Sequence, residues 1–523
     1  MTVDYDVLVI GGGVNGVAIA RDAVGRGYSV ALAEMNDLGW ATSSASTKLF
    51  HGGLRYLEYF EFGLVRKALI EREALLEAMP HISWPMRFVL PYHSDMRFDS
   101  DTPTSRILNR IFPWLKGRRP AALLRLGLFL YDYMGGRKIL PATTSVDLTT
   151  DPAGDPLKAK FEKAYEYSDC WIEDSRLVSL SAKDAKARGA NIWTRTKVVS
   201  ASRQSDHWIV TLRDMLTGAE RSVTCTALVN AAGPWVADIT DDTAKIDTKK
   251  GVRLVRGSHI VTKRLFDHDK CYFFQGRDGR ISFAIPYETD FTLLGTTDAA
   301  HEDADTSPEC SDTERDYMLN FASEYFEKPV TQDDIVWSYS GVRPLYDDGA
   351  SSATAATREY VLDLDQTAAP ILSVYGGKIT THRKLAEAVV DQLNEAFGKS
   401  DTTWTKGVAL PGGDFAVEDV QAKIDQVMVD YSFLTTVWAR RVIKAYGTEA
   451  WDVLGDAETK EDLGQEFGAT LTAREVDWLV AQEFAMTAED IIWRRTKLGL
   501  RLSSSEIDAL NTYLQTIEIP RAA

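Results

Sequence analysis

The chain has 523 residues, of which 45% are hydrophobic and 26% charged, and its formal net charge at pH 7 is −17. This length favours more than one domain, and the acidic balance argues against a general nucleic-acid-binding protein. The four cysteines are far apart and form no CxxC pair, so we predict no metal site and expect a reducing compartment. The first residues lack the basic region of a secretory signal, and no apolar run reaches the roughly 18 residues that a membrane-spanning helix needs.

The first 34 residues contain the clearest pattern. YDVLVI predicts a buried strand, a helix follows at 14–24, and a second strand at 28–33 ends at Glu34. Gly11, Gly13 and Gly16 between strand and helix are spaced G-x-G-x-x-G. The first glycine permits a tight turn, the second lets a pyrophosphate approach the backbone, and the third allows close helix packing. Since an acid here binds a ribose, the pattern predicts a dinucleotide site.

The segment TSSASTKLFHGGLRYLEYF, residues 42–60, follows this acid and does not alternate like a strand. Its hydroxyl run suits a pyrophosphate, and its glycine pair would let backbone lie close to a flat ring. His51 is a candidate base because imidazole titrates near neutral pH. Histidines are also often structural, and His259 in RGSHIV is the rival base.

Residues 105–140 reverse the acidic trend. Eight lysines and arginines, Arg118 and Arg119 among them, alternate with leucines and aromatic residues, and Asp132 is the one acid. This pattern is typical of a helix lying in an anionic membrane surface. The alternative is a basic cap that packs on the protein's own core.

A later strand, TALVNAAGPWVADI at 226–239, favours FAD over NAD. In two-domain flavoproteins such a strand returns to the first sheet, and its small residues pass close to the cofactor. An ordinary strand-to-helix turn is the alternative. We find no second G-x-G-x-x-G motif, so one dinucleotide is expected, and we see no anchor for covalent FAD.

Two further segments carry cations. WSYSGVRPLYDD places Arg343 at the end of a strand-like run, and its planar fork suits a phosphate or an oxyanion. ILSVYGGKITTHRKLAEAVV predicts a strand, two glycines and a helix that starts near Lys378 and directs its dipole at the cofactor. A surface salt bridge is the alternative for each. RISFAIPYETDFTLLGTTD predicts two antiparallel strands.

The chain becomes helical after LPGGDF at 410–415. Capping pairs are expected at Thr472, Thr487 and Ser503, each with an acid three residues later. The pattern predicts a helical C-terminal domain at 411–523, with dimer or partner contacts as its possible role.

Together, IGGGVNGVAIARDAVGRG, ATSSASTKLFHGGLRYLE, PMRFVLPYH, YSDCW, LVNAAGPWV, GSHIV, GTTD, WSYSGVRPL and GGKITTHRKLAE resemble the FAD-dependent, respiratory glycerol-3-phosphate dehydrogenases. The resemblance runs from about residue 4 to the C-terminus. It implies an α/β two-domain, Rossmann-like FAD-binding fold with an antiparallel-sheet substrate domain and the helical C-terminal domain. It also implies oxidation of sn-glycerol 3-phosphate to dihydroxyacetone phosphate by hydride transfer to non-covalent FAD, with electrons passing to membrane quinone.

Such chemistry needs a base, cations for the phosphate, and positive charge near the flavin pyrimidine. The resemblance places His51, Arg343 and His259 as catalytic candidates, without choosing between the histidines. It places the substrate at Arg55, Tyr56, Lys378 and Arg358. The expected cofactor-binding residues are Gly11, Gly13, Asn15, Gly16, Glu34, Thr42, Ser43, Ser46, Lys48, Gly52, Gly53, Ala232, Gly233, Gly377, Lys378, Ile379 and Thr380.

We expect a discontinuous FAD-binding domain at 1–80, 150–235 and 335–405, with a substrate-binding domain at 81–149 and 236–334. The expected location is cytoplasmic, at the inner face of the respiratory or plasma membrane, with a homodimer possible. Three alternatives stay open: a glycerol-3-phosphate oxidase using oxygen, an amine or amino-acid oxidase of the same fold, and a non-enzymatic flavin sensor. We see no obvious insertion of the kind that family oxidases carry, which favours the dehydrogenase.

Overall fold

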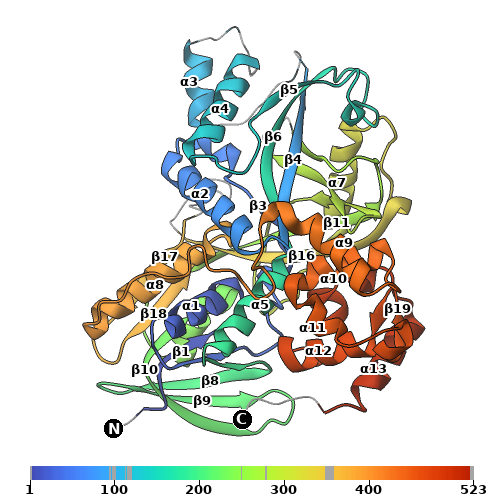
Figure 1. Cartoon of the computed structure of the whole chain (residues 1–523). Helices are drawn as coiled ribbons and strands as arrows, with labels where there is room; N and C mark the ends of the chain where they lie inside the picture. The colour runs from blue at the N-terminus through green and yellow to red at the C-terminus, as the bar shows by residue number, and fades with distance from the viewer. Residues whose placement is uncertain are drawn as a thin grey trace.

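The computed structural model describes residues 3–93, 96, 102–111, 114, 121–248, 250–276, 280–347 and 359–518. Two large sheets and a C-terminal group of helices make up this part of the chain (Figure 1). The predicted α/β class, with an antiparallel sheet and a helical C-terminal domain, is confirmed.

The first sheet carries the glycine-rich turn. Its strands lie in the order β17-β18-β10-β1-β2-β7, and β9 and β8 extend it from β10. The pairs from β18 to β7 are parallel, and their apolar residues are buried beneath helices, as expected for a parallel sheet. The bounds are β1 (Tyr5–Ile10), β2 (Val30–Ala33), β7 (Asn191–Trp193), β8 (Thr196–Arg203), β9 (Trp208–Asp214), β10 (Glu220–Asn230), β17 (Val361–Asp365) and β18 (Ile371–Tyr375).

Helix α1 (Val14–Gly25) covers this sheet between α5 (Asp174–Ala187) and α8 (His382–Phe397). Buried Asp22 and Arg26 of α1 form an ion pair, and Arg26 also binds Asp391 of α8 at 2.5 Å. The predicted strand-helix-strand unit at the start of the chain is therefore present, with its second strand beginning at Val30 instead of Tyr28.

The second sheet is mostly antiparallel, in the order β15-β11-β14-β13-β12-β4-β6-β3, with β16 on β11 and β5 on β6. The predicted pair within 280–298 is present as β13 and β14. The bounds are β3 (Leu49–Phe50), β4 (Ser83–Tyr92), β5 (Thr144–Asp147), β6 (Lys163–Ile172), β11 (Val252–Lys263), β12 (Cys271–Gln275), β13 (Ile281–Tyr287), β14 (Phe291–Gly295), β15 (Ala299–Ala300) and β16 (Ile335–Tyr346).

The two sheets share segments in a way that local patterns do not reveal. β3, β6 and β16 come from segments assigned to the FAD-binding domain, but they lie in the second sheet. Helices α2 (Phe62–Ala78) and α7 (Asp312–Tyr325) also pack against this sheet. The domain boundaries themselves stay a prediction.

The basic segment contains α3 (Pro103–Ile111) and α4 (Ala121–Met134), which stand at the top of Figure 1. Its described part exposes large apolar side chains, whereas Arg118 and Arg119 lie outside the described residues. Within the described ranges, no helix is long and apolar enough to cross a membrane. The exposed apolar side chains are Ile107, Ile111, Trp114, Leu126, Phe129 and Tyr133.

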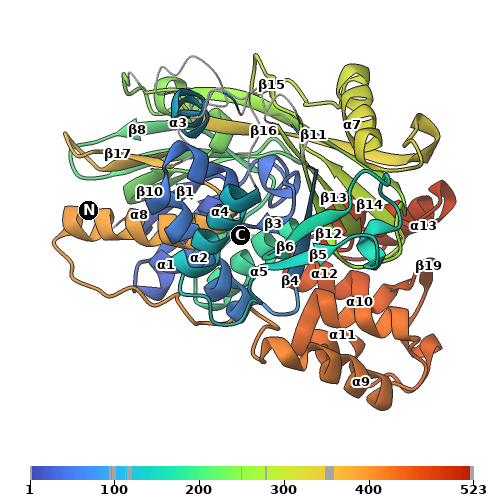
Figure 2. The same ribbon diagram turned by 90° about the horizontal axis from the view of Figure 1, so that it is seen from above.

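The C-terminal helices gather on the side of the molecule opposite α8 in both views (Figures 1 and 2). The capping pair is confirmed at Ser503, and Thr487 exchanges hydrogen bonds with Asp490. Thr472 is the N-cap residue of the helix that follows, as predicted, but its side chain makes no capping hydrogen bond and Glu475 pairs with Arg441. The bounds are α9 (Val420–Asp430), α10 (Thr436–Tyr446), α11 (Ala450–Leu454), β19 (Glu466–Gly468), β20 (Leu471–Thr472), α12 (Ala473–Glu483), the π-helix η12 (Asp490–Arg495) and α13 (Ser504–Leu514).

Candidate functional site

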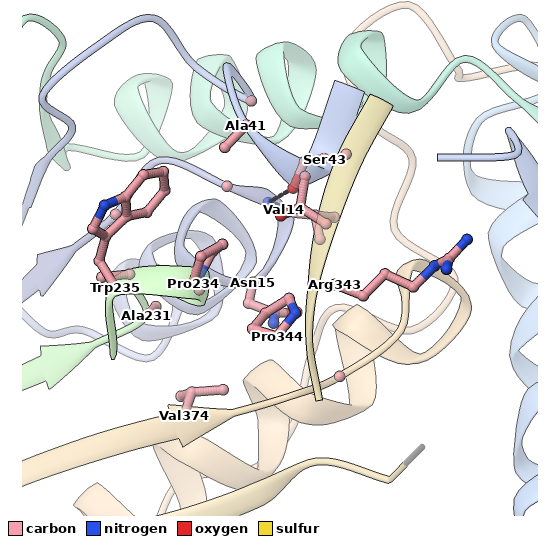
Figure 3. A pocket seen from close by; sticks show the side chains of 18 of the residues that line it. Val14, Asn15, Ala41, Ser43, Ala231, Pro234, Trp235, Arg343, Pro344 and Val374 are labelled. Atoms are coloured by element: carbon pink, nitrogen blue, oxygen red, sulfur yellow. Dashed lines mark hydrogen bonds between the residues drawn. The ribbon is translucent and has the colours of Figure 1, made fainter. Parts of the chain in front are cut away.

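A cavity of about 570 Å³ begins at the glycine-rich turn and continues beneath β16 (Figure 3). The strands β1, β2, β10 and β18 direct their carboxyl ends at it, which is where ligands bind in open α/β sheets. Predicted residues that line it are Gly11, Gly13, Asn15, Glu34, Thr42, Ser43, Ser46, His51, Tyr56, Ala232, Gly233, Arg343, Gly377, Lys378, Ile379 and Thr380.

The glycines of the turn are required by close backbone approach. Gly11 has φ +106°, and a Cβ there would lie 2.6 Å from the carbonyl oxygen of Ala231. A Cβ on Gly16 would lie 1.9 Å from the carbonyl oxygen of Gly11. Gly16 therefore acts from behind the cavity wall, by letting α1 approach β1, as its position in the motif predicts.

Glu34 lies at the opposite side of the turn. Its carboxylate accepts hydrogen bonds from the backbone N–H groups of Gly12 and Asn36, both at 2.7 Å. Burial raises the pKa of Glu34, and these two donors oppose that rise. Since each carboxylate oxygen has a second lone pair, the group can still accept from the hydroxyls of a ribose.

The segment after Glu34 is fixed from several sides. Ser43 Oγ accepts from the N–H of Val14 at the first turn of α1, at 2.9 Å, and Thr42 Oγ1 donates to the carbonyl oxygen of Val342 at 2.6 Å. Ser46 Oγ donates to Asp174 at 2.8 Å. The segment thus lies between the first sheet and β16, along the length of the cavity.

Lys48 lies away from the cavity. Its ammonium binds Asp174 Oδ1 at 2.7 Å, and both side chains are buried. Burial alone would raise the pKa of Asp174, but Lys48 and then Lys497 hold it below its ordinary value. A long-range ion pair therefore accounts for the Lys48 side chain.

The far end of the cavity collects side chains from distant segments. Lys378 Nζ lies 3.9 Å from the ring centroid of Tyr56, and Arg343 enters from β16. Thr380 Oγ1 lies 3.5 Å from the carbonyl oxygen of His51, which brings the two glycine-containing segments together. Two cations, a phenol ring and an imidazole from three distant segments therefore line one cavity.

Arg343 is held in a defined orientation. Its guanidinium donates to Asp298 Oδ1 at 2.6 Å and to Thr296 Oγ1 at 3.0 Å. It also lies directly over Gly257, because a Cβ there would come within 2.3 Å of it. Thr296 and Asp298 belong to the GTTD motif, so this motif supplies the partners of Arg343, a role that local patterns did not predict.

His259 lies behind the cavity wall. It is buried, stacks on Tyr339 with centroids 4.8 Å apart, and shares a 2.9 Å hydrogen bond with Thr47, a residue of the wall. Burial, and after it the charges of Arg343 and Lys48, hold the pKa of His259 well below its ordinary value. A neutral imidazole is the form that can accept a proton.

Other predicted residues lie around the wall instead of lining it. Gly52 donates its N–H to Tyr131 Oη at 2.7 Å, and Gly53, with φ +77°, starts the 3₁₀ turn η2 (Leu54–Tyr59). Arg55 lies on that turn, next to Tyr56. Arg358 falls outside the described residues. The sequence analysis missed further wall residues, namely Trp40, Thr196, Pro234, Trp235 and Pro344, four of which have apolar side chains.

The residues present fit a dinucleotide with a flat ring. Asn15 Nδ2 donates to the carbonyl oxygen of Gly376, but its buried Oδ1 has no hydrogen-bond partner in the part of the chain that the structure describes. A buried acceptor without a partner is costly, so a ligand donor at this point would remove that cost. Gly377 is next to Asn15, with φ +103°, and keeps the space open.

Two family models match the chain. Residues 6–383 match the FAD dependent oxidoreductases, and residues 403–518 match the C-terminal domain of alpha-glycerophosphate oxidase. The D-erythritol 1-phosphate dehydrogenase of Brucella abortus is 46% identical over 96% of both chains. The glycerol-3-phosphate dehydrogenase of Pseudomonas aeruginosa is 44% identical, over 98% of this chain and 95% of its own.

A solved structure agrees over nearly the whole length. The glycerol-3-phosphate dehydrogenase of Bacillus halodurans, complexed with FAD, aligns with a TM-score of 0.72 at 25% identity. The alignment covers 98% of this chain and 94% of that one.

Proposed function

The chain belongs to the FAD-dependent oxidoreductases and, within them, to the glycerol-3-phosphate dehydrogenase family, and we propose that it oxidises a phosphorylated polyol, sn-glycerol 3-phosphate. Its cofactor is FAD, as the sequence predicts. D-erythritol 1-phosphate is the second candidate substrate, because the Brucella relative named for it is 46% identical. Both candidates carry a secondary alcohol near a dianionic phosphate.

The observation that carries the proposal is that Arg343, Lys378 and Tyr56 line the same cavity as the glycine-rich turn, with Lys378 Nζ 3.9 Å from the ring centroid of Tyr56. Two cations in one cavity suit a phosphate dianion, which an amine or amino-acid substrate lacks. The guanidinium presents a planar fork, and the ammonium presents a point charge. Because both line the same cavity as the predicted FAD contacts, the phosphate would lie beside the reacting carbon.

When bound, FAD supplies the acceptor for the hydride that leaves the alcohol carbon. Arg343 and Lys378 would hold the phosphate, and Asp298 and Thr296 would keep the guanidinium in position. A histidine would take the hydroxyl proton, either His51 in the cavity wall or neutral His259 behind Thr47. The predicted roles of Arg55 and Arg358 in binding the phosphate stay proposals.

The proposed electron acceptor is a membrane quinone. Support comes from α3 and α4, where Ile107, Ile111, Trp114, Phe129 and Tyr133 are exposed beside a basic sequence. Such a surface suits peripheral binding to anionic lipid, with the protein at the inner membrane face. In vesicle flotation, Trp114→Ser/Phe129→Ser should lose binding, and Val429→Ser, at a side chain 75% exposed elsewhere, should not. Equal flotation of all three proteins would contradict the membrane proposal.

Steady-state turnover with a soluble quinone analogue tests the substrate proposal. sn-Glycerol 3-phosphate and D-erythritol 1-phosphate should both be oxidised, the first with the higher kcat/KM. Glycerol lacks the phosphate, so its kcat/KM should be lower than that of sn-glycerol 3-phosphate by about a hundredfold or more, since both cations lose their partner. An amino acid that turns over as well as the phosphorylated polyols would contradict the proposal. Peroxide release at the rate of quinone reduction would instead indicate an oxidase.

A further inference from the structure

The loop after β2 forms the wall at the glycine-rich end of the cavity. Met35, Asn36 and Trp40 line the cavity, but Asp37 between them points into the protein and is 1% exposed. The N–H of Gly39 donates to the carbonyl oxygen of Gly12 at 3.0 Å. Any interaction that fixes the position of Asp37 therefore also constrains the cavity wall on either side of it and the glycine-rich turn.

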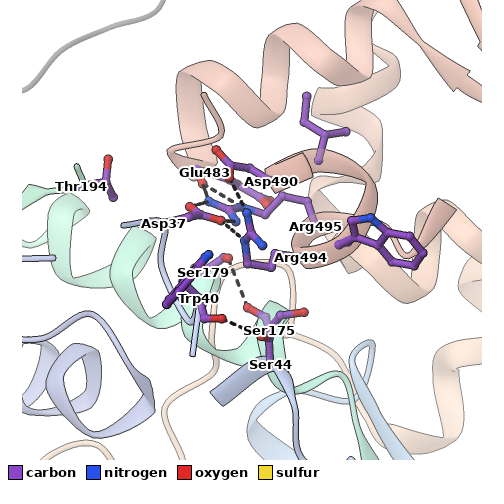
Figure 4. Close-up of polar contacts among 12 residues, drawn as sticks. Asp37, Trp40, Ser44, Ser175, Ser179, Thr194, Glu483, Asp490, Arg494 and Arg495 are labelled. Atoms are coloured by element: carbon purple, nitrogen blue, oxygen red, sulfur yellow. Dashed lines mark hydrogen bonds and ion pairs between the residues drawn. The ribbon is translucent and has the colours of Figure 1, made fainter. Parts of the chain in front are cut away.

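Asp37 is held by the C-terminal domain (Figure 4). Arg495 donates to both of its carboxylate oxygens, at 2.7 and 2.8 Å, and Arg494 Nε donates to one of them at 2.5 Å. Both arginines belong to η12, more than 450 positions further along the chain. A bidentate arginine fixes direction as well as distance, so the loop is held in one orientation.

The arginines are themselves fixed from behind. Arg495 donates to the carbonyl oxygen of Glu483, and Arg494 binds Asp490 at 2.5 Å. Asp490 also binds Arg195, whose backbone N–H donates to the carbonyl oxygen of Asn36 at 3.0 Å. The loop is thus tied to the C-terminal domain at two neighbouring residues.

This cluster is almost fully buried, since Asp37, Asp490 and Arg495 are each at most 1% exposed. Buried ion pairs contribute little net stability compared with apolar packing, but they impose a specific geometry. The geometry imposed here is that of the wall which FAD must contact. Nothing in the proposed oxidation step requires these three residues.

We propose that Asp37, Arg494 and Arg495 are positioning residues for FAD, through which the C-terminal domain holds the nucleotide end of the cofactor site in its binding shape. The C-terminal domain therefore contributes to FAD retention although it lies outside the cavity. This inference depends on the FAD cofactor, not on which polyol is oxidised.

The test is the dissociation constant of FAD, measured by titrating apo-protein and following flavin fluorescence at a temperature well below unfolding. Asp37→Asn keeps the size of the side chain but removes its charge, and it should weaken FAD binding by about tenfold or more. The matched control is Arg441→Gln, which breaks another largely buried ion pair of the same domain, Arg441 to Glu475, away from the loop and its two arginines. The control should lose thermal stability yet bind FAD within about twofold of the wild type.

A double variant separates positioning from global stability. Asp37→Asn/Arg495→Gln removes the unpaired buried charge, so its melting temperature should recover relative to Asp37→Asn, while FAD binding stays weak. Wild-type FAD affinity in Asp37→Asn would overturn the proposal. So would equal weakening in Arg441→Gln, or full recovery of affinity in the double variant. If Asp37→Asn does not fold, Arg495→Lys carries the same test, because it keeps the charge but loses the bidentate fork and should still weaken FAD binding.

Discussion

The two ends of the cavity are built in different ways. At the glycine-rich end, backbone groups and one buried acid form the wall, and glycines allow approaches in which a Cβ would lie 1.9 to 2.6 Å from a carbonyl oxygen. The far end is formed by side chains from three distant segments, His51, Tyr56, Arg343 and Lys378. The first end should decide whether FAD stays bound, and the second whether the substrate reacts.

The largest effect is expected from Arg343→Ala. The substrate phosphate would lose its fork, so kcat/KM should fall about a thousandfold, or about 4 kcal/mol, while flavin absorbance stays with the protein. Arg343→Lys should lose less. Arg253→Ala, on the neighbouring strand β11 and outside this cavity wall, is the control and should stay near wild type. Loss of FAD from Arg343→Ala would contradict the assignment of FAD binding to one end of the cavity and of substrate reaction to the other.

Gly16→Ala should reduce FAD binding, in contrast to Arg343→Ala, which should reduce turnover. Its Cβ would lie 1.9 Å from the carbonyl oxygen of Gly11, so the turn must move and the protein should purify with little FAD. The ratio of flavin to protein absorbance measures this. Gly63→Ala on α2 is the control, because nothing lies within 4 Å of its Cβ. A fully loaded Gly16→Ala protein would show that the turn does not limit cofactor binding.

The base can be identified by comparing His51→Gln with His259→Gln. Loss of the base should lower kcat by about a hundredfold, with FAD still bound, whereas the other histidine should change chiefly KM. The pH dependence of kcat/KM adds a second criterion. Because the pKa of His259 is held well below its ordinary value, His259 as base predicts activity that persists below pH 6.5. Near-wild-type kcat in both variants would remove both histidines from the proton transfer.

The smallest effect concerns Lys497, a buried residue of the C-terminal domain that lies near Lys48 and Asp174. Burial lowers its pKa to about 8, and its ammonium donates to Ser175 Oγ at 3.0 Å. Between pH 8 and its unfolded pKa the unfolded state binds more protons, so stability from this group should rise with pH. Relative to Lys497→Met, the wild type should gain about 2 kcal/mol across this window in denaturant unfolding. Parallel pH profiles of the two proteins would contradict this.

The sequence predicted the glycine-rich end well because its signal is local. A strand, a spaced set of glycines, a helix and an acid within 34 residues determine that wall. The family resemblance added Arg343 and Lys378, which the structure brings into the same cavity.

Local sequence patterns could not predict contacts between residues that are far apart in the chain. Lys48 was expected at the cofactor, but its charge is taken by Asp174, which is 126 positions away. Asp298 behind Arg343 is 45 positions away in the chain, and the arginines on Asp37 belong to another domain, so these contacts likewise depend on long-range packing. β16 was assigned to the FAD-binding domain for the same reason. The apolar pattern of one segment does not show which distant strand it pairs with, and here β16 pairs with β11.

Anaerobic addition of sn-glycerol 3-phosphate to the purified protein tests the central claim most directly. The flavin absorbance bands should bleach in full with about one equivalent of substrate per FAD, and dihydroxyacetone phosphate should form in the same amount, because hydride transfer carries two electrons to one flavin. D-Erythritol 1-phosphate should bleach them more slowly. Flavin bands that neither phosphorylated polyol changes would contradict the account.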